Sequence, residues 1–268
     1  MASEGQQPAS KPQPQPASNI PKGKREVKIL MVHGYMQSAS IFSAKTKALH
    51  KILTQTLPTL HFNLIFPSGP HRLRYSDIPD YTPPEGVEEE DLDKWAWYRA
   101  NDATGEYRGL EAGMQTIAST IRDAGGVDGV MGFSQGGCMA ALIAGAMEEP
   151  RHEPPDQQHR AWMDELRAAN NGRPLKFCVV YSGFRARPEA GLDWLYEPRI
   201  VTPNIHFIGA LEEERIEVGS QRLIDVSKDP SVHRHPGGHF VPCSRMWVMQ
   251  LAAFLKVHCE ESTAKEAL

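Results

Sequence analysis

The sequence has few of the features that mark a membrane protein or a nucleic-acid-binding protein. It contains no run of 18 apolar residues, so no transmembrane helix is predicted. The N-terminus lacks a charged region followed by an apolar region, so no secretory signal is predicted. The formal net charge is −4, whereas proteins that bind nucleic acid usually present a basic face. We therefore expect neither a membrane span nor a nucleic-acid partner.

Cysteine is also scarce, with four residues scattered over 268 positions. None of them has C-x-x-C spacing, and no compact group of histidine and cysteine suggests zinc, so we expect no metal. Scattered cysteines in apolar segments are typical of reduced thiols inside the cell rather than of a disulfide framework. We expect a cytoplasmic location, with the nucleus as the alternative. The sequence carries no sign of the oligomeric state.

The apolar content of 40% is sufficient for a sizeable core. We predict a disordered Pro/Gln-rich tail over 1–24, a single domain over 25–259 and a frayed tail over 260–268. Strands and helices alternate along the chain, which predicts an α/β fold with a mostly parallel sheet and helices on both faces. The expected strands are 27–32, 61–66, 127–131, 175–181, 204–209 and 231–235. The expected helices are 38–53, 107–124, 137–147, 161–168, 218–226 and 240–259.

Residues 67–105 form a long polar excursion that contains four consecutive residues with three aromatic rings, Trp95 to Tyr98. Such a long loop is usually functional or disordered. We interpret it as a flap with an aromatic anchor near the site, and simple packing of the loop onto the body is an equal alternative. Trp95, Trp97 and Phe184 are candidates for an apolar acyl pocket, and plain packing in the core is the equal alternative. The acidic run 88–91 is expected to be a solvated surface.

The pattern G-x-S-x-G occurs at 132–136 and places Ser134 between an apolar strand and a small-residue helix. This context is typical of a nucleophile elbow, a sharp turn that projects the serine hydroxyl from the sheet. Glycine is favoured on both sides because larger side chains would collide in so tight a turn. The alternative is an ordinary glycine-rich turn in which Ser134 caps the helix.

An acyl-transfer site also needs donors for the oxyanion. The backbone N–H of Gln135, directly after the nucleophile, is one candidate. An earlier strand ends in His-Gly and is followed by Tyr35 and Met36, and the backbone N–H of one of these two is the second candidate.

A serine nucleophile needs a histidine as base and a carboxylate that orients it. In the chain order Ser, acid, His, the loop H-P-G-G-H-F-V-P predicts His239 as the base, with His235 as the alternative. We place Pro242 in the first turn of the last helix. The segment after the preceding strand predicts Glu212 as the acid. Its neighbours Glu213 and Glu214, and more distant Asp193 and Asp225, remain alternatives.

These motifs together resemble the FSH family of eukaryotic serine hydrolases, over about residues 25–258. The stretches that carry the resemblance include K-I-L-M-V-H-G-Y-M-Q-S, W-A-W-Y, G-F-S-Q-G-G, S-G-F and H-P-G-G-H-F-V-P. The resemblance implies an α/β-hydrolase fold with Ser134 as nucleophile and His239 as base. The family commonly has an aspartate where this chain has Glu212, and an apolar pair where it has Glu214 and Arg215.

We therefore expect a serine hydrolase that cleaves small-molecule carboxylic esters or thioesters through an acyl-enzyme, without a cofactor. One alternative is a lactone or C–C hydrolase, or a thioesterase, of a secondary-metabolite pathway. Another is a weakly active hydrolase-like binding protein.

Overall fold

The main element of the fold is a six-stranded sheet with the strand order β10-β9-β8-β7-β1-β2. All five neighbouring pairs are parallel, which confirms the α/β prediction. The structure is a computed structural model that describes residues 20–78, 86, 88–89, 92–150 and 152–260. Except for 20–24 and 260, the predicted tails over 1–24 and 260–268 lie outside these residues, as do residues 90 and 91 of the acidic run 88–91.

The sheet strands are β1 (Arg25–Val32), β2 (Leu60–Ile65), β7 (Gly129–Phe133), β8 (Phe177–Tyr181), β9 (Asn204–Gly209) and β10 (Ser231–His235). The helices are α1 (Ala39–Thr56), α2 (Leu110–Asp123), α3 (Gln135–Met147), α4 (Gln157–Ala169), α5 (Glu214–Asp225) and α6 (Arg245–Glu260). Four two-residue strands form two small ribbons: β3 (His71–Arg72) with β4 (Trp95–Ala96), and β5 (Arg99–Ala100) with β6 (Tyr107–Arg108). Short 3₁₀ turns lie at Tyr75–Asp77, Pro188–Ala190 and Asp193–Leu195.

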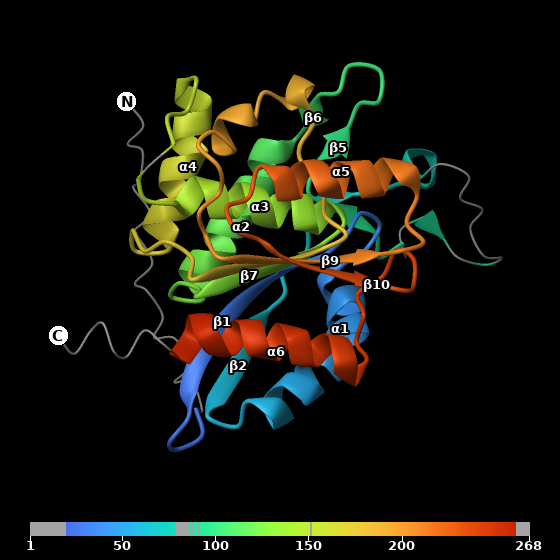
Figure 1. Cartoon of the computed structure of the whole chain (residues 1–268). Helices are drawn as coiled ribbons and strands as arrows, with labels where there is room; N and C mark the ends of the chain where they lie inside the picture. Colours follow the sequence, from blue (N-terminus) through green and yellow to red (C-terminus); the bar gives the residue numbers. More distant parts are fainter. Residues whose placement is uncertain (1–19, 79–85, 87, 90–91, 151, 261–268) are drawn as a thin grey trace, which may run out of the picture.

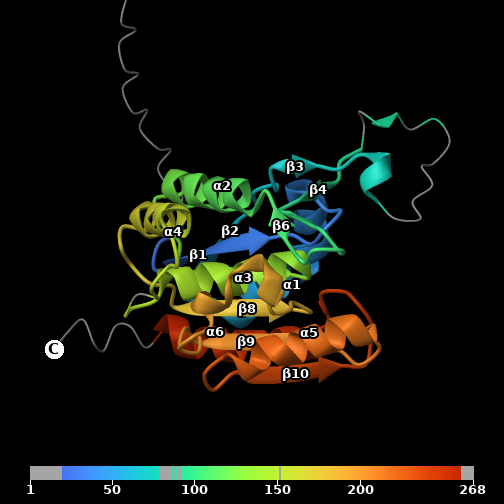
Figure 2. The ribbon, with the colours of Figure 1, turned by 90° about the horizontal axis from the view of Figure 1, so that it is seen from above.

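The helices form a layer on each face of the sheet. Helices α1 and α6 cover one face, and α2, α3, α4 and α5 cover the other (Figure 1). The view from above looks along the direction in which these layers stack, so helices overlap the strands, and the small ribbons lie at one end of the molecule (Figure 2). Alternate residues of β1 point into different cores. Ile29 packs with the α1 and α6 residues, whereas Leu30 packs with those of α2, α3 and α4. This division follows from the two-residue period of a strand.

The position of helix α3 explains why its sequence is so rich in small residues. All 13 of its residues are buried, because the helix lies between the sheet and the outer helices α2 and α4. A helix that is apolar on every side is expected in such a position.

Among the described residues, no helix is long and apolar enough to cross a membrane.

Several predicted boundaries differ from the structure. The last helix begins at Arg245 rather than at 240, so Pro242 lies before it and not in its first turn. Helix α4 runs over 157–169, longer than the expected 161–168, because Asp156 caps it by accepting a hydrogen bond from His159 N–H. The excursion over 67–105 contains β3, β4, β5 and a 3₁₀ turn, so it is more ordered than a plain loop.

The strand order reverses direction between β1 and β7. The chain moves from β1 outward to β2 on one side, and from β7 through β8 and β9 to β10 on the other. In open parallel sheets, ligands bind at the carboxyl ends of the strands at such a point. The segments that follow β1 and β7 contain Tyr35 and Ser134, respectively. The fold therefore places both sequence motifs at the same end of neighbouring strands.

Candidate active site

Ser134 occupies the turn between β7 and α3 in a strained backbone conformation. Its φ of 53° and ψ of −117° lie in a region that non-glycine residues rarely adopt. A Cβ atom on Gly136 would overlap the backbone oxygens of Val32 and His33, and one on Gly132 would overlap the backbone of Gly136. Glycine is therefore required at both positions, and the turn has the form that the sequence pattern predicts.

His239 reaches the nucleophile from the loop between β10 and α6. Its Nε2 lies 2.9 Å from Ser134 Oγ, and its ring packs against Phe133 with a centroid separation of 4.8 Å. The loop is tied to the segment after β9, because Leu211 N–H donates to Gly237 O over 3.0 Å. The alternative base, His235, is 1% exposed, and its ring lies tilted against that of Phe240 instead.

Glu212 completes the chain of hydrogen bonds that begins at Ser134 and passes through His239. Its Oε2 lies 2.7 Å from His239 Nδ1. The side chain is only 1% exposed, so water does not compete for this contact. The alternative acids lie elsewhere: Glu213 precedes α5 as its cap, Asp193 pairs with Arg185, and Asp225 accepts from Gln221. Glu214 is the first residue of α5, so among these candidate acids only Glu212 contacts His239.

Ser182 is a member of this site that the sequence analysis did not identify. Its hydroxyl donates to Glu212 Oε1 over 2.5 Å, and the residue is fully buried with a φ of 45°. It directly follows β8, the neighbour of the strand that precedes Glu212. The motif S-G-F was visible in the sequence, but nothing in it indicates a partner 30 residues away.

Two backbone N–H groups near Ser134 are free to bind an oxyanion. Within the described chain, neither Tyr35 N–H nor Gln135 N–H donates a hydrogen bond to another residue. Met36 N–H, by contrast, donates to Trp95 O over 3.1 Å. The geometry thus favours Tyr35 over Met36 as the partner of Gln135.

A cleft of about 1530 Å³ opens next to Ser134. Phe184 lines it, as do Tyr35 and Gln135. The prediction that Trp95 and Trp97 line the pocket is wrong. Trp97 is fully buried in the core and donates from Nε1 to His33 O, and Trp95 lies outside the cleft, where its Nε1 donates to Asp93.

The aromatic segment instead attaches the 67–105 excursion to the elbow. Gln135 Oε1 accepts from Trp97 N–H over 2.8 Å, and Gln135 Nε2 donates to Tyr98 O over 2.9 Å. His33 contributes on the other side, since its Nε2 accepts from Gly69 N–H over 2.9 Å. Burial lowers the pKa of His33 to about 4, so this ring is neutral and can accept the bond.

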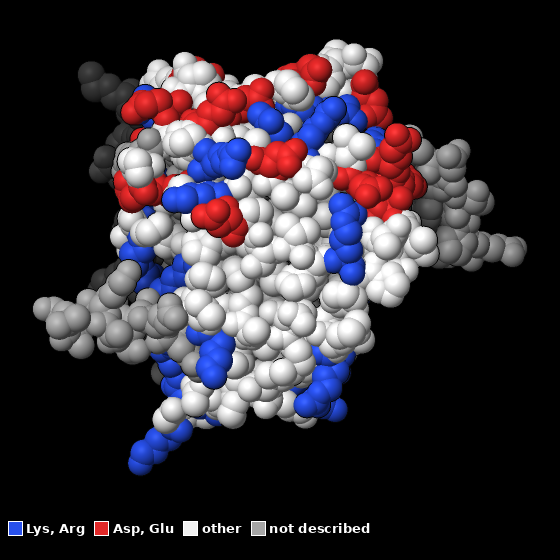
Figure 3. All heavy atoms as spheres, in the orientation of Figure 1, with Lys and Arg blue, Asp and Glu red and all other residues white. Residues whose placement is uncertain are grey.

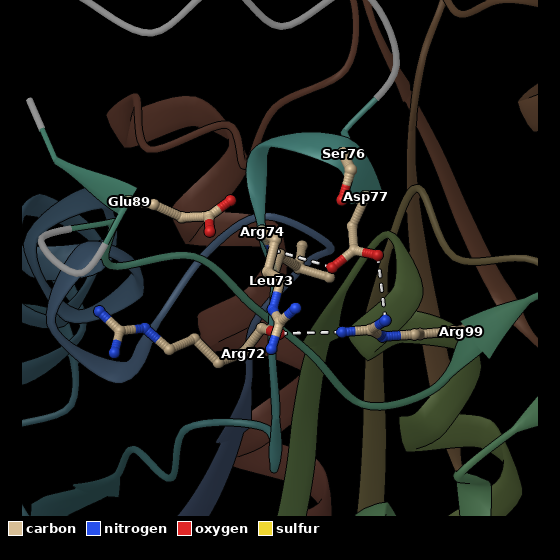
Figure 4. Close-up of a pocket in the computed structure, with 7 residues that line it drawn as sticks. All are labelled: Arg72, Leu73, Arg74, Ser76, Asp77, Glu89 and Arg99. Atoms are coloured by element: carbon tan, nitrogen blue, oxygen red, sulfur yellow. Dashed lines mark hydrogen bonds and ion pairs between the residues drawn. The ribbon is translucent and has the colours of Figure 1, made fainter.

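A second hollow of about 540 Å³ lies beside the cleft and shares Asp77 and Arg99 with it. The close-up shows Arg99 reaching both Asp77 and the backbone oxygen of Arg72 (Figure 4). The ion pair between Arg99 and Asp77 spans 3.0 Å. This hollow contains none of the predicted site residues. Among the described residues, no group of three or more His, Cys, Asp or Glu side chains could hold a metal ion.

Comparison with known proteins gives a family match and several relatives. The model of the family described as serine hydrolase (FSH1) matches residues 23–251. The zebrafish (Danio rerio) protein named esterase OVCA2 is 26% identical over 242 residues, which cover 86% of this chain and 96% of that protein. The Saccharomyces cerevisiae protein named family of serine hydrolases 2 is 27% identical, covering 85% and 97%.

A fission yeast (Schizosaccharomyces pombe) protein named dihydrofolate reductase is 27% identical over 237 residues, and this chain spans 47% of its length. Among solved structures, acyl-protein thioesterase 2 from Zea mays superposes with a TM-score of 0.55 at 17% identity, covering 89% of this chain and 96% of that one. At this identity the likeness shows the fold alone, which is that of α/β hydrolases.

Proposed function

Because the chain belongs to the serine hydrolase (FSH1) family, we propose that it hydrolyses carboxylic esters or thioesters with Ser134, His239 and Glu212 as its catalytic triad. The observation that carries this assignment is the continuous hydrogen-bonded row from Ser134 Oγ through His239 to Glu212, with separations of 2.9 and 2.7 Å. A relative that spans nearly the same length is named an esterase.

In the first half of the reaction, Ser134 Oγ attacks the acyl carbonyl while His239 Nε2 accepts the hydroxyl proton. Glu212 holds the proton on Nδ1 and stabilises the imidazolium that forms. The carbonyl oxygen becomes negative and is bound by the N–H groups of Gln135 and Tyr35; loss of one such donor typically costs about 10²- to 10³-fold in turnover. The positive end of helix α3 points at the same position.

The tetrahedral intermediate then collapses. The bond between the acyl carbon and the leaving oxygen or sulfur breaks, and His239 returns its proton to the leaving group. In the second half, His239 takes a proton from water as the water oxygen attacks the acyl carbon. The bond from that carbon to Ser134 Oγ then breaks, His239 returns the proton to Oγ, and the carboxylic acid is released. These steps use only side chains and backbone groups of this chain.

Trapping of the acyl-enzyme tests this proposal. The protein is mixed with the 4-nitrophenyl ester of hexanoic acid or with a hexanoyl thioester, quenched in acid within the first turnover and analysed by peptide mass spectrometry. We expect hexanoylation at Ser134, loss of turnover in Ser134→Ala, and normal turnover in Ser43→Ala, which removes an exposed hydroxyl on α1. Turnover that persists in Ser134→Ala would contradict the assignment.

A further inference from the structure

The cleft beside Ser134 is lined by an excess of basic side chains, although the chain as a whole carries a net charge of −4. Its lining contains more guanidinium groups than carboxylates. The arginines are Arg99, Arg108, Arg185, Arg187, Arg215 and Arg222, and the acids are Asp77, Asp102, Glu189 and Glu214. Two of these acids, Glu189 and Glu214, form no ion pair with a described residue, so the binding of an anion depends on individual guanidinium groups rather than on the charge of the lining as a whole.

Four of these arginines already have carboxylate partners within the described chain. The pairs are Arg99 with Asp77 at 3.0 Å, Arg108 with Glu106 at 3.5 Å, Arg185 with Asp193 at 2.9 Å and Arg187 with Asp102 at 2.7 Å. Their charge is largely neutralised by the protein itself.

The other two, Arg215 and Arg222, make no hydrogen bond or ion pair with any residue that the structure describes. Both belong to α5, seven positions apart, and Val218 and Gly219 lie between them along the same face. This spacing of three, four and seven residues places all four on one side of a helix. All four line the same cleft as Ser134. Arg222 has no carboxylate partner among the described residues, and Arg215 only adds, after Arg187, to the positive charge that lowers the pKa of Asp102.

Helix α5 is held firmly against the site. A Cβ atom on Gly219 would lie 2.8 Å from the Cβ of Phe184, which shows how closely the helix approaches the segment after β8. Gly219 O also accepts from Arg185 N–H over 3.0 Å, and Ser220 Oγ donates to Gly183 O over 2.6 Å. Arg215 and Arg222 therefore extend from a helix whose position is set by contacts with the segment directly after β8.

The surface view shows where charged side chains of both signs lie (Figure 3). Charged side chains gather in the upper half of the face shown, where Figure 1 places α5, and the surface below them is mostly uncharged (Figure 3). A purely apolar acyl chain laid along the α5 face would displace water from two guanidinium groups without giving them a partner, which is costly. A carboxylate or phosphate satisfies them with paired hydrogen bonds, for which arginine is well suited.

From this arrangement we propose that the preferred substrates are esters or thioesters that carry an anionic group, a carboxylate or a phosphate, away from the scissile bond, and that Arg215 and Arg222 bind this group. The inference rests on the proposed function, since it names the class of substrate for the same site. The anion can belong to the acyl part or to the leaving group, and the experiment distinguishes the two.

Three thioesters with matched six-carbon acyl chains test the proposal. Hexanoyl-N-acetylcysteamine is neutral, adipoyl-N-acetylcysteamine adds a carboxylate at the acyl end, and hexanoyl-coenzyme A adds phosphates to the leaving group. We expect kcat/KM for at least one anionic thioester to exceed that of the neutral one by about tenfold or more, and the advantage to shrink with added salt. Which of the two is favoured identifies the end of the substrate that carries the anion.

Variants connect the preference to the two arginines. In Arg215→Ala/Arg222→Ala, the ratio of kcat/KM for the anionic thioester to that for the neutral one should fall by about tenfold, the loss expected for a paired charge contact. Arg245→Ala removes an exposed arginine at the start of α6, outside the cleft, and should leave the ratio as in wild type. A preference for the neutral thioester, or an equal loss for all three in the double variant, would overturn the proposal.

Binding to Ser134→Ala keeps this test separate from the proposed chemistry. Calorimetric titration of Ser134→Ala with the three thioesters should show tighter binding of the favoured anionic one, and the advantage should vanish when Arg215 and Arg222 are also replaced by alanine. Equal binding of neutral and anionic thioesters would contradict the inference even if hydrolysis proceeds as proposed. Selective anion binding without turnover by the native chain would contradict only the proposed function.

Discussion

The Ser182 hydroxyl donates to Oε1 of Glu212 over 2.5 Å, and His239 contacts the other oxygen of the same carboxylate over 2.7 Å. Both oxygens of a side chain that is 1% exposed are thus occupied. The hydroxyl fixes the direction in which the carboxylate faces the histidine ring. Ser182 is therefore a positioning residue that acts through Glu212.

Replacement of Ser182 by alanine should lower kcat by about tenfold with little change in KM, since a hydrogen bond to a charged group contributes about 1.5–3 kcal/mol. Steady-state kinetics with one ester measures the effect. Ser182→Gly is the matched control, because glycine also lacks the hydroxyl but accepts the φ of 45° without strain. Equal losses in the two variants would support the positioning role of the hydroxyl, and wild-type activity in Ser182→Gly would refute that role.

The carboxylate itself is tested by Glu212→Gln. The amide keeps the shape of the side chain but cannot stabilise the charged imidazolium, and a change of this kind in a serine protease costs about 10⁴-fold in kcat. We expect a loss of roughly 10³- to 10⁴-fold here. Glu213→Gln, one residue away and outside the site, should retain kcat close to wild type. A large loss of kcat in Glu213→Gln with near-wild-type kcat in Glu212→Gln would instead identify Glu213 as the triad acid.

The tight turn around Ser134 predicts a difference in stability between two glycine substitutions. Gly136→Ala forces a methyl group against backbone oxygens of β1 and the next residue, which cannot move away. We expect it to lower the free energy of unfolding by about 3 kcal/mol or more. Gly172→Ala, where nothing lies within 4 Å and only a φ of 70° is unfavourable, should cost about 1–2 kcal/mol. Urea denaturation measures the free energy of unfolding of both variants. A larger loss in Gly172→Ala than in Gly136→Ala would contradict this prediction.

Two buried histidines predict how stability depends on pH. Burial lowers the pKa of His33 and of His206 to about 4, from an ordinary value of 6.5. Below pH 6.5 the unfolded chain takes up protons that the folded chain refuses until about pH 4. Stability is therefore complete above pH 6.5 and falls as the pH drops toward 4, by about 1.4 kcal/mol per pH unit for each histidine.

Urea denaturation at pH 7, 6 and 5 measures this slope. In His206→Gln, the free energy of unfolding should change less between pH 6 and 5, by about the amount that one histidine contributes per pH unit. A free energy of unfolding that stays constant from pH 7 to 5, or an unchanged slope in the variant, would show that the buried rings do not control acid sensitivity.

The nucleophile and the base could be located from sequence because each depends on a local pattern. The spacing of glycines around Ser134 reflects a turn that only glycine permits, and the loop that ends in His239 follows the last strand directly. Glu212 could be singled out only with alternatives, because an acidic triplet gives no indication of which side chain points inward. The structure shows Glu212 inward and Glu213 at the cap of α5.

What escaped prediction depends on contacts between segments distant in sequence. Trp97 was expected in the pocket because aromatic residues suit both a pocket and a core, and only the hydrogen bond from its Nε1 to His33 O places it in the core. The contact between Ser182 and Glu212 requires β8 and β9 to be neighbours. The last helix begins late because the turn at Phe240, whose N–H donates to Gly238 O, interrupts the helical path.

Labelling with a fluorophosphonate probe tests the central claim, the activation of Ser134 by His239, most directly. The rate of probe attachment is measured by mass spectrometry in the native chain, in Ser134→Ala, in His239→Ala and in the surface control Ser43→Ala. We predict rapid attachment at Ser134 in the native chain and in Ser43→Ala, none at that position in Ser134→Ala, and slow attachment in His239→Ala. Attachment to Ser134 at the same rate without His239, or no attachment to the native chain, would contradict the account.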